Sequence, residues 1–276
     1  MAMRWISFSK FPGFKFRGER SDDRSVRRAR LYGVGLGKSG THSLAAMFSG
    51  SLRVAHEAEA GELIEKILAW RHGQLKEEDF HAWLRARDRR LALEVDASCL
   101  NPWLLDFLLR EFPDARFVLT IRDCYSWTNS FLNHWLRQPA TDARWATLNA
   151  MNFGSIDGPF APAEQRLKEL GFYPLAVYLK HWAKKNGRIV EKIPPARLLV
   201  VRTDQLRARA LEIADFAGVP HCMVNLDKTH EFSNPAKQDL LRQIDRDFVE
   251  REVERCCGPL MAQYFPEIKS LAEARL

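Results

Sequence analysis

The segment from Leu31 to Leu44 constrains the fold of this chain more than any other. It reads Leu-Tyr-Gly-Val-Gly-Leu-Gly-Lys-Ser-Gly-Thr-His-Ser-Leu, an apolar run followed by a glycine-rich turn and then by a helix that we expect to start near Thr41. In such a unit, backbone N–H groups and the positive end of the helix dipole converge where an anion can bind. Lys38 adds a full positive charge there. The sequence therefore predicts an anion-binding turn at the start of an α/β domain.

Residue types within the turn support this interpretation. Gly37 and Gly40 are expected to adopt positive φ and to let an anion approach the backbone closely. The phosphate-binding loop of ATPases requires G-x-x-x-x-G-K-[ST], but Tyr32 occupies the first glycine position here. The alternative is a turn that merely joins a strand to a helix. Three hydroxyl donors lie in the segment: Ser39, Thr41 and Ser43.

Short apolar runs alternate with helical patterns along the rest of the chain. This alternation predicts an α/β fold in which helices cover both faces of a central parallel sheet, a three-layer α/β/α arrangement. Residues 137–170 contain several Pro and Gly residues and are interpreted as an irregular lid, whereas an apolar stripe near the C-terminus predicts a core helix. The expected strands are 31–35, 52–55, 91–95, 116–121 and 197–201, and the expected packing helices are 62–70 and 102–112. The stripe consists of Leu240, Leu241, Ile244, Phe248 and Val253.

A second candidate binding segment runs from Arg116 to Phe131. It reads as a buried strand, then Arg122, then a helix that carries Ser130 eight residues later. Open α/β sheets bind ligands just beyond the carboxyl ends of their strands, which is where Arg122 falls. Taken alone, Arg122 and Asp123 would equally suit a surface salt bridge.

Together, the Lys-Ser-Gly-Thr-x-x-Leu turn and the Arg122–Ser130 pair resemble the donor site of sulfotransferases that use 3′-phosphoadenosine 5′-phosphosulfate (PAPS). The resemblance spans about residues 30–220 and implies the P-loop NTPase-like sulfotransferase fold. It also implies sulfuryl transfer to a hydroxyl, adenosine 3′,5′-bisphosphate (PAP) as product, and no metal. Arg122 and Ser130 would hold the 3′-phosphate, with Lys228 as a C-terminal basic residue, although the Arg-Lys-Gly loop of the cytosolic branch is absent. The 5′-phosphosulfate loop would comprise Lys38, Ser39, Gly40, Thr41, His42 and Ser43.

The general base is left open between two positions. Glu57, assisted by His56, resembles a His-Glu pair that follows the second strand in some bacterial and sugar-modifying relatives, while Asp96 ends the expected third strand. Both carboxylates would equally serve as hydrogen-bonding groups at strand ends. His42 and His134 lie near donor-binding positions, but a lone helical histidine is more often packed or capped than catalytic.

Charge and cysteine content limit the partners. Residues 1–30 hold nine Lys and Arg against three acidic residues, so they carry +6 of the formal charge of +7. The body, residues 31–276, is nearly neutral, and we expect no nucleic-acid partner. The five cysteines lack the spacing of a disulfide framework or zinc site, and no secretory or transmembrane segment is recognised. A cytoplasmic location is therefore expected.

The basic arm, residues 1–30, also contains five aromatic residues. It would dock on the body, stay partly disordered, bind an anionic acceptor, or make a peripheral membrane contact. Aromatic residues in the lid indicate a small-molecule, glycolipid or saccharide acceptor with an apolar part. The oligomeric state is not predicted. Two rival functions are kept: a nucleotide-dependent kinase with a degenerate phosphate loop, and a relative that binds nucleotide without catalysis.

Overall fold

The computed structural model describes residues 26–137, 142–154, 156, 158–229 and 238–276. Five parallel strands form one sheet in the order β2-β3-β1-β4-β5. The strands are β1 (Leu31–Gly33), β2 (Val54–His56), β3 (Val95–Ala97), β4 (Arg116–Ile121) and β5 (Leu198–Arg202). The register aligns Leu31 with both Val95 and Arg116, so β1 lies at the centre. The predicted parallel α/β sheet is confirmed.

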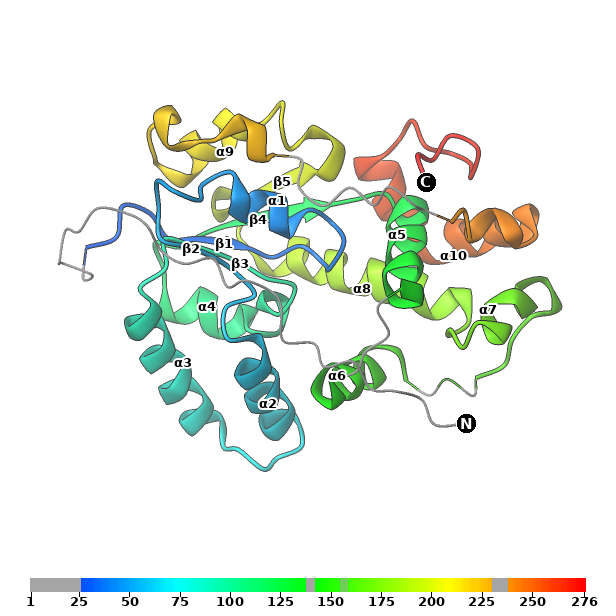
Figure 1. Cartoon of the computed structure of the whole chain (residues 1–276), viewed down its shortest axis with the longest axis horizontal. Helices are drawn as coiled ribbons and strands as arrows, with labels where there is room; N and C mark the ends of the chain where they lie inside the picture. The colour runs from blue at the N-terminus through cyan, green and yellow to red at the C-terminus, as the bar shows by residue number, and fades with distance from the viewer. Residues whose placement is uncertain (1–25, 138–141, 155, 157, 230–237) are drawn as a thin grey trace.

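Helices cover both faces of the sheet (Figure 1). On one face, α1 (Thr41–Ala46) and α9 (Ala210–Ala217) enclose a core that includes Leu44, Val118 and Ile213. A larger core on the other face contains Phe117 and Trp182. It is enclosed by α2 (Ala60–Arg71), α3 (Glu77–Leu91), α4 (Leu105–Glu111), α5 (Cys124–Arg137), α8 (Leu175–Lys192) and α10 (Arg246–Tyr264).

The expected third strand was wrong in position. Residues 91–95 were expected to form it, but α3 continues to Leu91 and β3 begins only at Val95. Helix α3 went unrecognised because its buried side chains include Arg87 besides Phe80 and Leu84, which weakens the apolar periodicity. The other four strands overlap their expected ranges.

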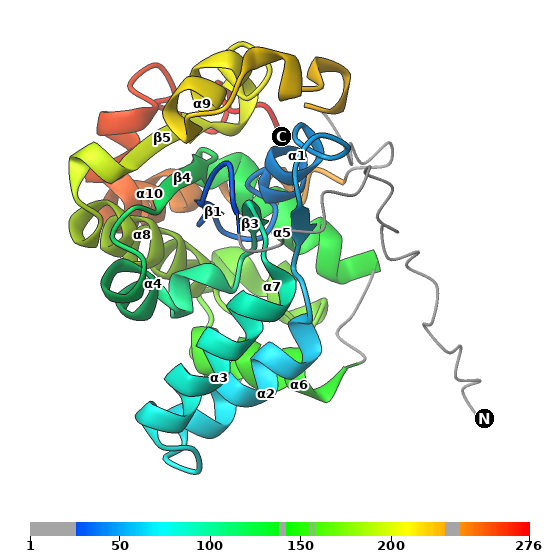
Figure 2. The same ribbon diagram turned by 90° about the vertical axis from the view of Figure 1, so that its left-hand side faces the viewer.

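Residues 137–170 are more regular than expected. Helices α6 (Ala143–Phe153) and α7 (Gln165–Glu169) form there, with Asp142 capping α6 by accepting a hydrogen bond from the Arg144 backbone. Arg144 also pairs with Glu65 of α2 at 3.0 Å. Figure 2 shows α2, α3 and α6 grouped at the same end of the molecule. This part of the chain is therefore anchored on α2, and its role as a lid stays a prediction.

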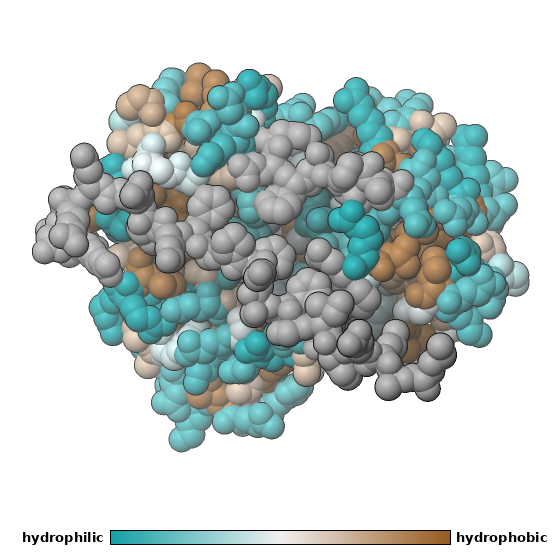
Figure 3. Space-filling model, viewed as in Figure 1, coloured by the Kyte–Doolittle hydropathy of each residue, from teal (hydrophilic) through white to brown (hydrophobic). Residues whose placement is uncertain are grey.

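The C-terminal apolar stripe belongs to the core as predicted, but it is not one helix, because α10 begins only at Arg246 and Leu240, Leu241 and Ile244 precede it. Leu240, Leu241, Ile244 and Val253 are buried, and Phe248 packs against the same core. Most of the basic arm lies outside the described residues, but its last residues contact the body: Arg27 pairs with Asp88 at 2.9 Å and Arg28 with Glu94 at 3.0 Å. Among the described residues, no helix is long and apolar enough to cross a membrane. Figure 3 shows a face on which hydrophilic and hydrophobic areas alternate.

Candidate active site

The turn after β1 lies at the carboxyl edge of the sheet, where its strand order changes direction. Lys38 has φ 68° and Gly40, the residue before α1, has φ 99°. A left-handed conformation costs a non-glycine residue of the order of 1 kcal/mol, so surrounding contacts must hold it. One such contact is the indole Nε1–H of Trp127, which donates to the Gly37 carbonyl at 2.9 Å. Helix α5 thus fixes the shape of the turn beside Lys38.

The glycine expectations are met at one position and not at another. Gly40 takes the positive φ that was predicted, but Gly37 does not. A Cβ placed on Gly37 would meet only Cys99, at 3.9 Å. Glycine is required instead at Gly35, where a Cβ would lie 2.2 Å from Thr120 Oγ1 and 2.5 Å from its carbonyl oxygen. The adjacent strand β4 causes this restriction, and the local sequence does not reveal it.

Hydroxyl groups in the turn are bonded within the protein. Ser39 Oγ donates to the Leu36 carbonyl at 2.6 Å and lies 3.2 Å from Thr120 Oγ1. Thr41 Oγ1 lies 3.1 Å from His56 Nε2. Ser39 therefore stabilises the turn itself, whereas Thr41 links the start of α1 to the end of β2.

Glu57 lies directly after β2 and faces the same region. Its φ is 53°, and its N–H donates to the Ala97 carbonyl at 3.2 Å. The Cys99 thiol donates to Glu57 Oε1 at 3.0 Å. Burial and the Glu57 charge raise the pKa of Cys99 well above its usual value, so the thiol keeps its proton. One hydrogen bond therefore holds the backbone of Glu57, and a second, from the Cys99 thiol, orients its carboxylate.

Three histidines belong to the segments that form this region: His42, His56 and His134. The His56 and His42 rings lie 4.9 Å apart, and His56 Nε2 lies 3.9 Å from Glu57 Oε1. Burial lowers the pKa of His56, while the charges of Glu57 and Asp96 raise it and that of Lys38 lowers it further. Burial, together with the positive charge of Lys38, lowers the pKa of His134 to about 4, against the opposing effect of Glu57. His134 is therefore neutral at pH 7, and the charges of Lys38 and Glu57 both act on its imidazole.

From the sequence, His134 was expected to be a packed or capping histidine and not a catalytic one. The available signal was its spacing, because His134 follows Ser130 by four residues on α5 and therefore lies on the same helix face.

Asp96 is placed differently from Glu57. Its side chain is buried, with Oδ2 3.3 Å from Arg87 Nη1 on α3. Burial raises the pKa of Asp96, while Arg87 acts in the opposite direction. Arg87 also donates to the Ala58 carbonyl at 2.8 Å and lies 3.6 Å from Glu59. The Arg87–Asp96 pair therefore supports the turn that carries Glu57, and the structure does not place Asp96 at the Lys38 turn.

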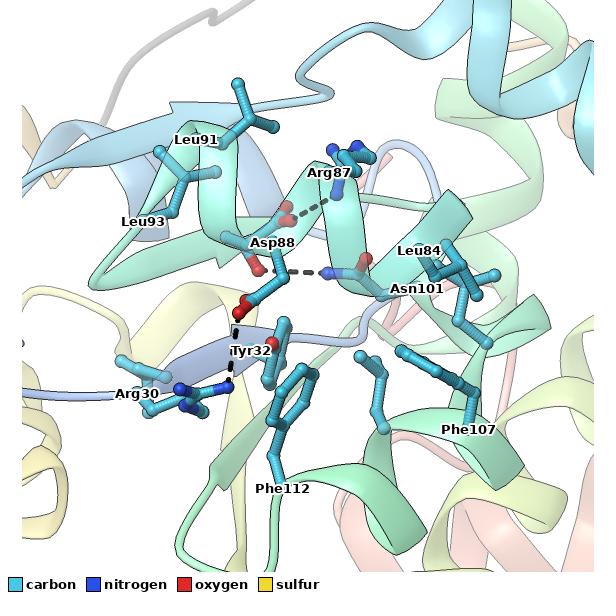
Figure 4. Close-up of a pocket in the computed structure, with 14 residues that line it drawn as sticks. Arg30, Tyr32, Leu84, Arg87, Asp88, Leu91, Leu93, Asn101, Phe107 and Phe112 are labelled. Carbon is cyan, nitrogen blue, oxygen red and sulfur yellow. Dashed lines mark hydrogen bonds and ion pairs between the residues drawn. The ribbon is translucent and has the colours of Figure 1, made fainter. Parts of the chain in front are cut away.

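The Arg87–Asp96 pair borders a small cavity below β1 (Figure 4). Its volume of about 20 Å³ matches one or two water molecules. Tyr32 projects into it from β1 and stacks on Phe112, with ring centroids 6.2 Å apart. Arg30 lies at its edge, at the amino end of the strand. This cavity is therefore separate from the Lys38 turn at the carboxyl end.

Arg122 follows β4 as predicted and is half-buried. Its carbonyl accepts a hydrogen bond from the Trp182 indole at 3.0 Å, and burial lowers the pKa of its guanidinium. Thr203, after β5, joins this edge to the turn, since its hydroxyl lies 2.5 Å from the Ser39 carbonyl oxygen and 3.1 Å from that of Ile121. The two predicted donor-binding segments are thus held side by side.

Ser130 and Lys228 occupy different surroundings. Ser130 is half-buried on α5, where the neighbouring Asn129 accepts a hydrogen bond from the Leu240 N–H at 2.9 Å. Lys228 Nζ donates to Ser49 Oγ at 3.1 Å, beyond the C-terminal end of α1. Since α1 is six residues, or about 9 Å, long, Lys228 lies away from the Lys38 turn.

Comparison with known families now gives this geometry a context. The model of the sulfotransferase domain matches residues 30–222, more than two-thirds of the chain. The chain belongs to the sulfotransferase family. The matched region contains the Lys38 turn, Glu57, Arg122 and Ser130 of this sulfotransferase, but ends before Lys228.

Solved structures with a similar arrangement are also sulfotransferases. One from Alicyclobacillus acidocaldarius is 20% identical with a TM-score of 0.48, and the match covers 85% of this chain and 96% of that one. STF9 from Mycobacterium avium is 14% identical, with coverage of 87% and 77% and a TM-score of 0.46. Mouse SULT7A1, solved with PAP, is 12% identical, with coverage of 91% and 90% and a TM-score of 0.43. No curated protein sequence gives a significant match. Family membership therefore rests on the domain model.

Proposed function

We propose that this sulfotransferase moves the sulfuryl group of PAPS to a hydroxyl of a small-molecule, glycolipid or saccharide acceptor. The observation that carries the proposal is that Glu57 and His56 lie beside the Lys38 turn, to which the Thr41–His56 contact links them, within the matched sulfotransferase domain. Sulfuryl transfer requires a cation for the donor and one proton acceptor for the hydroxyl, and Glu57 and His134 are two candidates for that acceptor.

Lys38 has the role of balancing charge on the donor. Sulfuryl transfer resembles phosphoryl transfer, in which an in-line transition state builds negative charge on the leaving oxygen. The Lys38 ammonium would stabilise the bridging oxygen, while backbone N–H groups of residues 39–43 would hold the 5′-phosphate. Arg122 and Ser130 would bind the 3′-phosphate. The Thr203 contacts support this division, because they hold the two segments next to each other.

Glu57 is our proposed base. The protonated Cys99 thiol bonds Oε1, and His56 Nε2 lies 3.9 Å from the same oxygen, so the thiol bond leaves Oε2 to accept a proton. His134 is a second candidate for the same step, since its lowered pKa keeps its imidazole neutral and able to accept a proton. We assign Asp96 a positioning role through Arg87.

The decisive experiment is calorimetric titration with PAP in the absence of metal, compared with ATP and magnesium. A sulfotransferase binds PAP without metal, whereas the kinase alternative predicts a preference for ATP with magnesium. Lys38→Met and Arg122→Met should each weaken PAP binding, while the exposed residues Lys76 and Arg89 provide matched controls as Lys76→Met and Arg89→Met. Absence of PAP uptake by the wild-type protein would refute the donor assignment.

Catalysis is tested separately from binding. A single-turnover reaction with labelled PAPS and a panel of hydroxylated acceptors should give a labelled product with the wild-type protein. PAP binding without transfer to any acceptor would favour the non-catalytic alternative. Glu57→Gln and His134→Gln then distinguish the two candidate bases in a pH–rate profile. Only the substitution of the true base should abolish the rise in rate that accompanies deprotonation of that base.

A further inference from the structure

Two cationic side chains lie near one indole ring close to the candidate active site. Lys185 Nζ, on α8, lies 3.8 Å from the Trp103 ring centroid, and the Arg71 guanidinium, at the end of α2, lies 6.0 Å from it. Trp103 and Lys185 are half-buried and Arg71 is exposed. The cluster is therefore accessible to a solute while part of its charge is shielded from water.

This charge is not balanced by nearby acids. Within the described ranges, neither Lys185 nor Arg71 has a carboxylate at ion-pair distance, and the neighbouring Asp106 already pairs with Arg188 and Lys192. Cations held together in a partly desolvated place repel each other, and an anion between them would relieve this repulsion.

The pKa of Lys185 reflects the same excess of positive charge. Burial, followed by the positive charges of Arg188, Lys184 and Arg71, lowers the pKa of Lys185 to about 8, and the Cys99 thiol acts weakly in the other direction. Lys185 is therefore mostly protonated at pH 7 and loses its charge as the pH rises through 8.

The cluster lies next to the group that we assign as base. Trp103 follows Cys99 by four residues, and Cys99 donates to Glu57. Four residues before Lys185 on α8, the His181 ring stacks on Trp127 at 6.1 Å, and that indole bonds the Lys38 turn. The cluster is thus linked through Cys99 to Glu57, and through α8 and Trp127 to the Lys38 turn.

We propose that Lys185 and Arg71, gathered on Trp103 beside the Cys99–Glu57 pair, bind an anionic group of the acceptor. The acceptor class is then a hydroxylated molecule with a carboxylate, sulfate or phosphate separated from the hydroxyl that is modified. This inference rests on the proposed function and narrows its acceptor.

The test uses pairs of acceptors that differ only in charge, for example phenolic carboxylic acids and their methyl esters, with labelled PAPS. Since a hydrogen bond to a charged group contributes more than a neutral one, Lys185→Met should raise KM for the acids roughly tenfold to a hundredfold. The esters should change less than about twofold. Lys185→Arg should restore much of the preference, and the exposed neighbour in Lys184→Met serves as the control.

The pH dependence supplies a second readout. In the wild-type protein, KM for the acids should rise above pH 8 as Lys185 loses its proton, while KM for the esters should not. Thermal melts show whether each variant is folded.

Equal use of acids and esters, or no reaction of any acid in a protein that binds PAP, overturns this inference and leaves the donor assignment intact. Failure to bind PAP instead removes the proposed function itself.

Discussion

Replacing Arg87 by Met tests the support beneath the Glu57 turn. The side chains of Arg87 and Asp96 are 9% and 7% exposed, so the substitution leaves a carboxylate buried without its cationic partner. Breaking a buried pair on one side typically costs about 3–5 kcal/mol of folding free energy. The double variant Arg87→Met with Asp96→Asn removes both charges and should recover a large part of that loss.

The pH dependence of the Arg87→Met defect has a defined sign. Burial already raises the pKa of Asp96, and loss of Arg87 raises it further, so the folded state binds a proton more readily than the unfolded state. Stability then increases as the pH falls through the folded-state pKa, and the defect becomes smaller in mildly acidic buffer.

Urea unfolding at several pH values, followed by circular dichroism, measures the Arg87→Met defect. Arg89→Met, on the exposed side of the same helix, is the control. A loss of less than about 1 kcal/mol in the unfolding free energy of Arg87→Met at pH 7.5 would contradict this prediction, since a buried unpaired charge costs more than this. The prediction is equally refuted if the double variant is no more stable than the single one.

Three further outcomes are expected. Lys38→Met should lower kcat about 100-fold or more, measured as single-turnover transfer, because the charge acts on the transition state; an unchanged rate contradicts this role. Arg122→Met should weaken PAP binding about tenfold or more by calorimetry, whereas Arg89→Met should not. Gly35→Ala should lower the melting temperature markedly, since its Cβ would overlap Thr120 on β4; a melt like that of the wild-type protein would contradict the close approach.

Features that depend on a single segment could be predicted from the local sequence. The expected strand at Arg116–Ile121 coincides with β4, and the helix expected near Thr41 begins there. Hydrophobic runs and a glycine turn are signals that a short stretch contains in full.

Features that depend on distant contacts were not accessible in the same way. The left-handed conformation occurs at Lys38 and not at Gly37. It occurs where the turn contacts α5, a helix about 90 residues further along the chain. The effect of the Lys38 charge on His134 likewise depends on α5, which packs beside the turn through Trp127. Asp96 could not be separated from Glu57 until α3 was seen to supply Arg87.

The Thr203 hydroxyl, which lies near the carbonyl oxygens of Ser39 and Ile121, has a consequence for how the donor would be gripped. A single side chain that follows β5 contacts both the β1 turn and the end of β4, so a displacement of one segment is transmitted to the other. The spacing between the two proposed phosphate sites would thus be fixed in the unliganded protein. A shorter or longer nucleotide could occupy both sites only by distorting the Thr203 contacts.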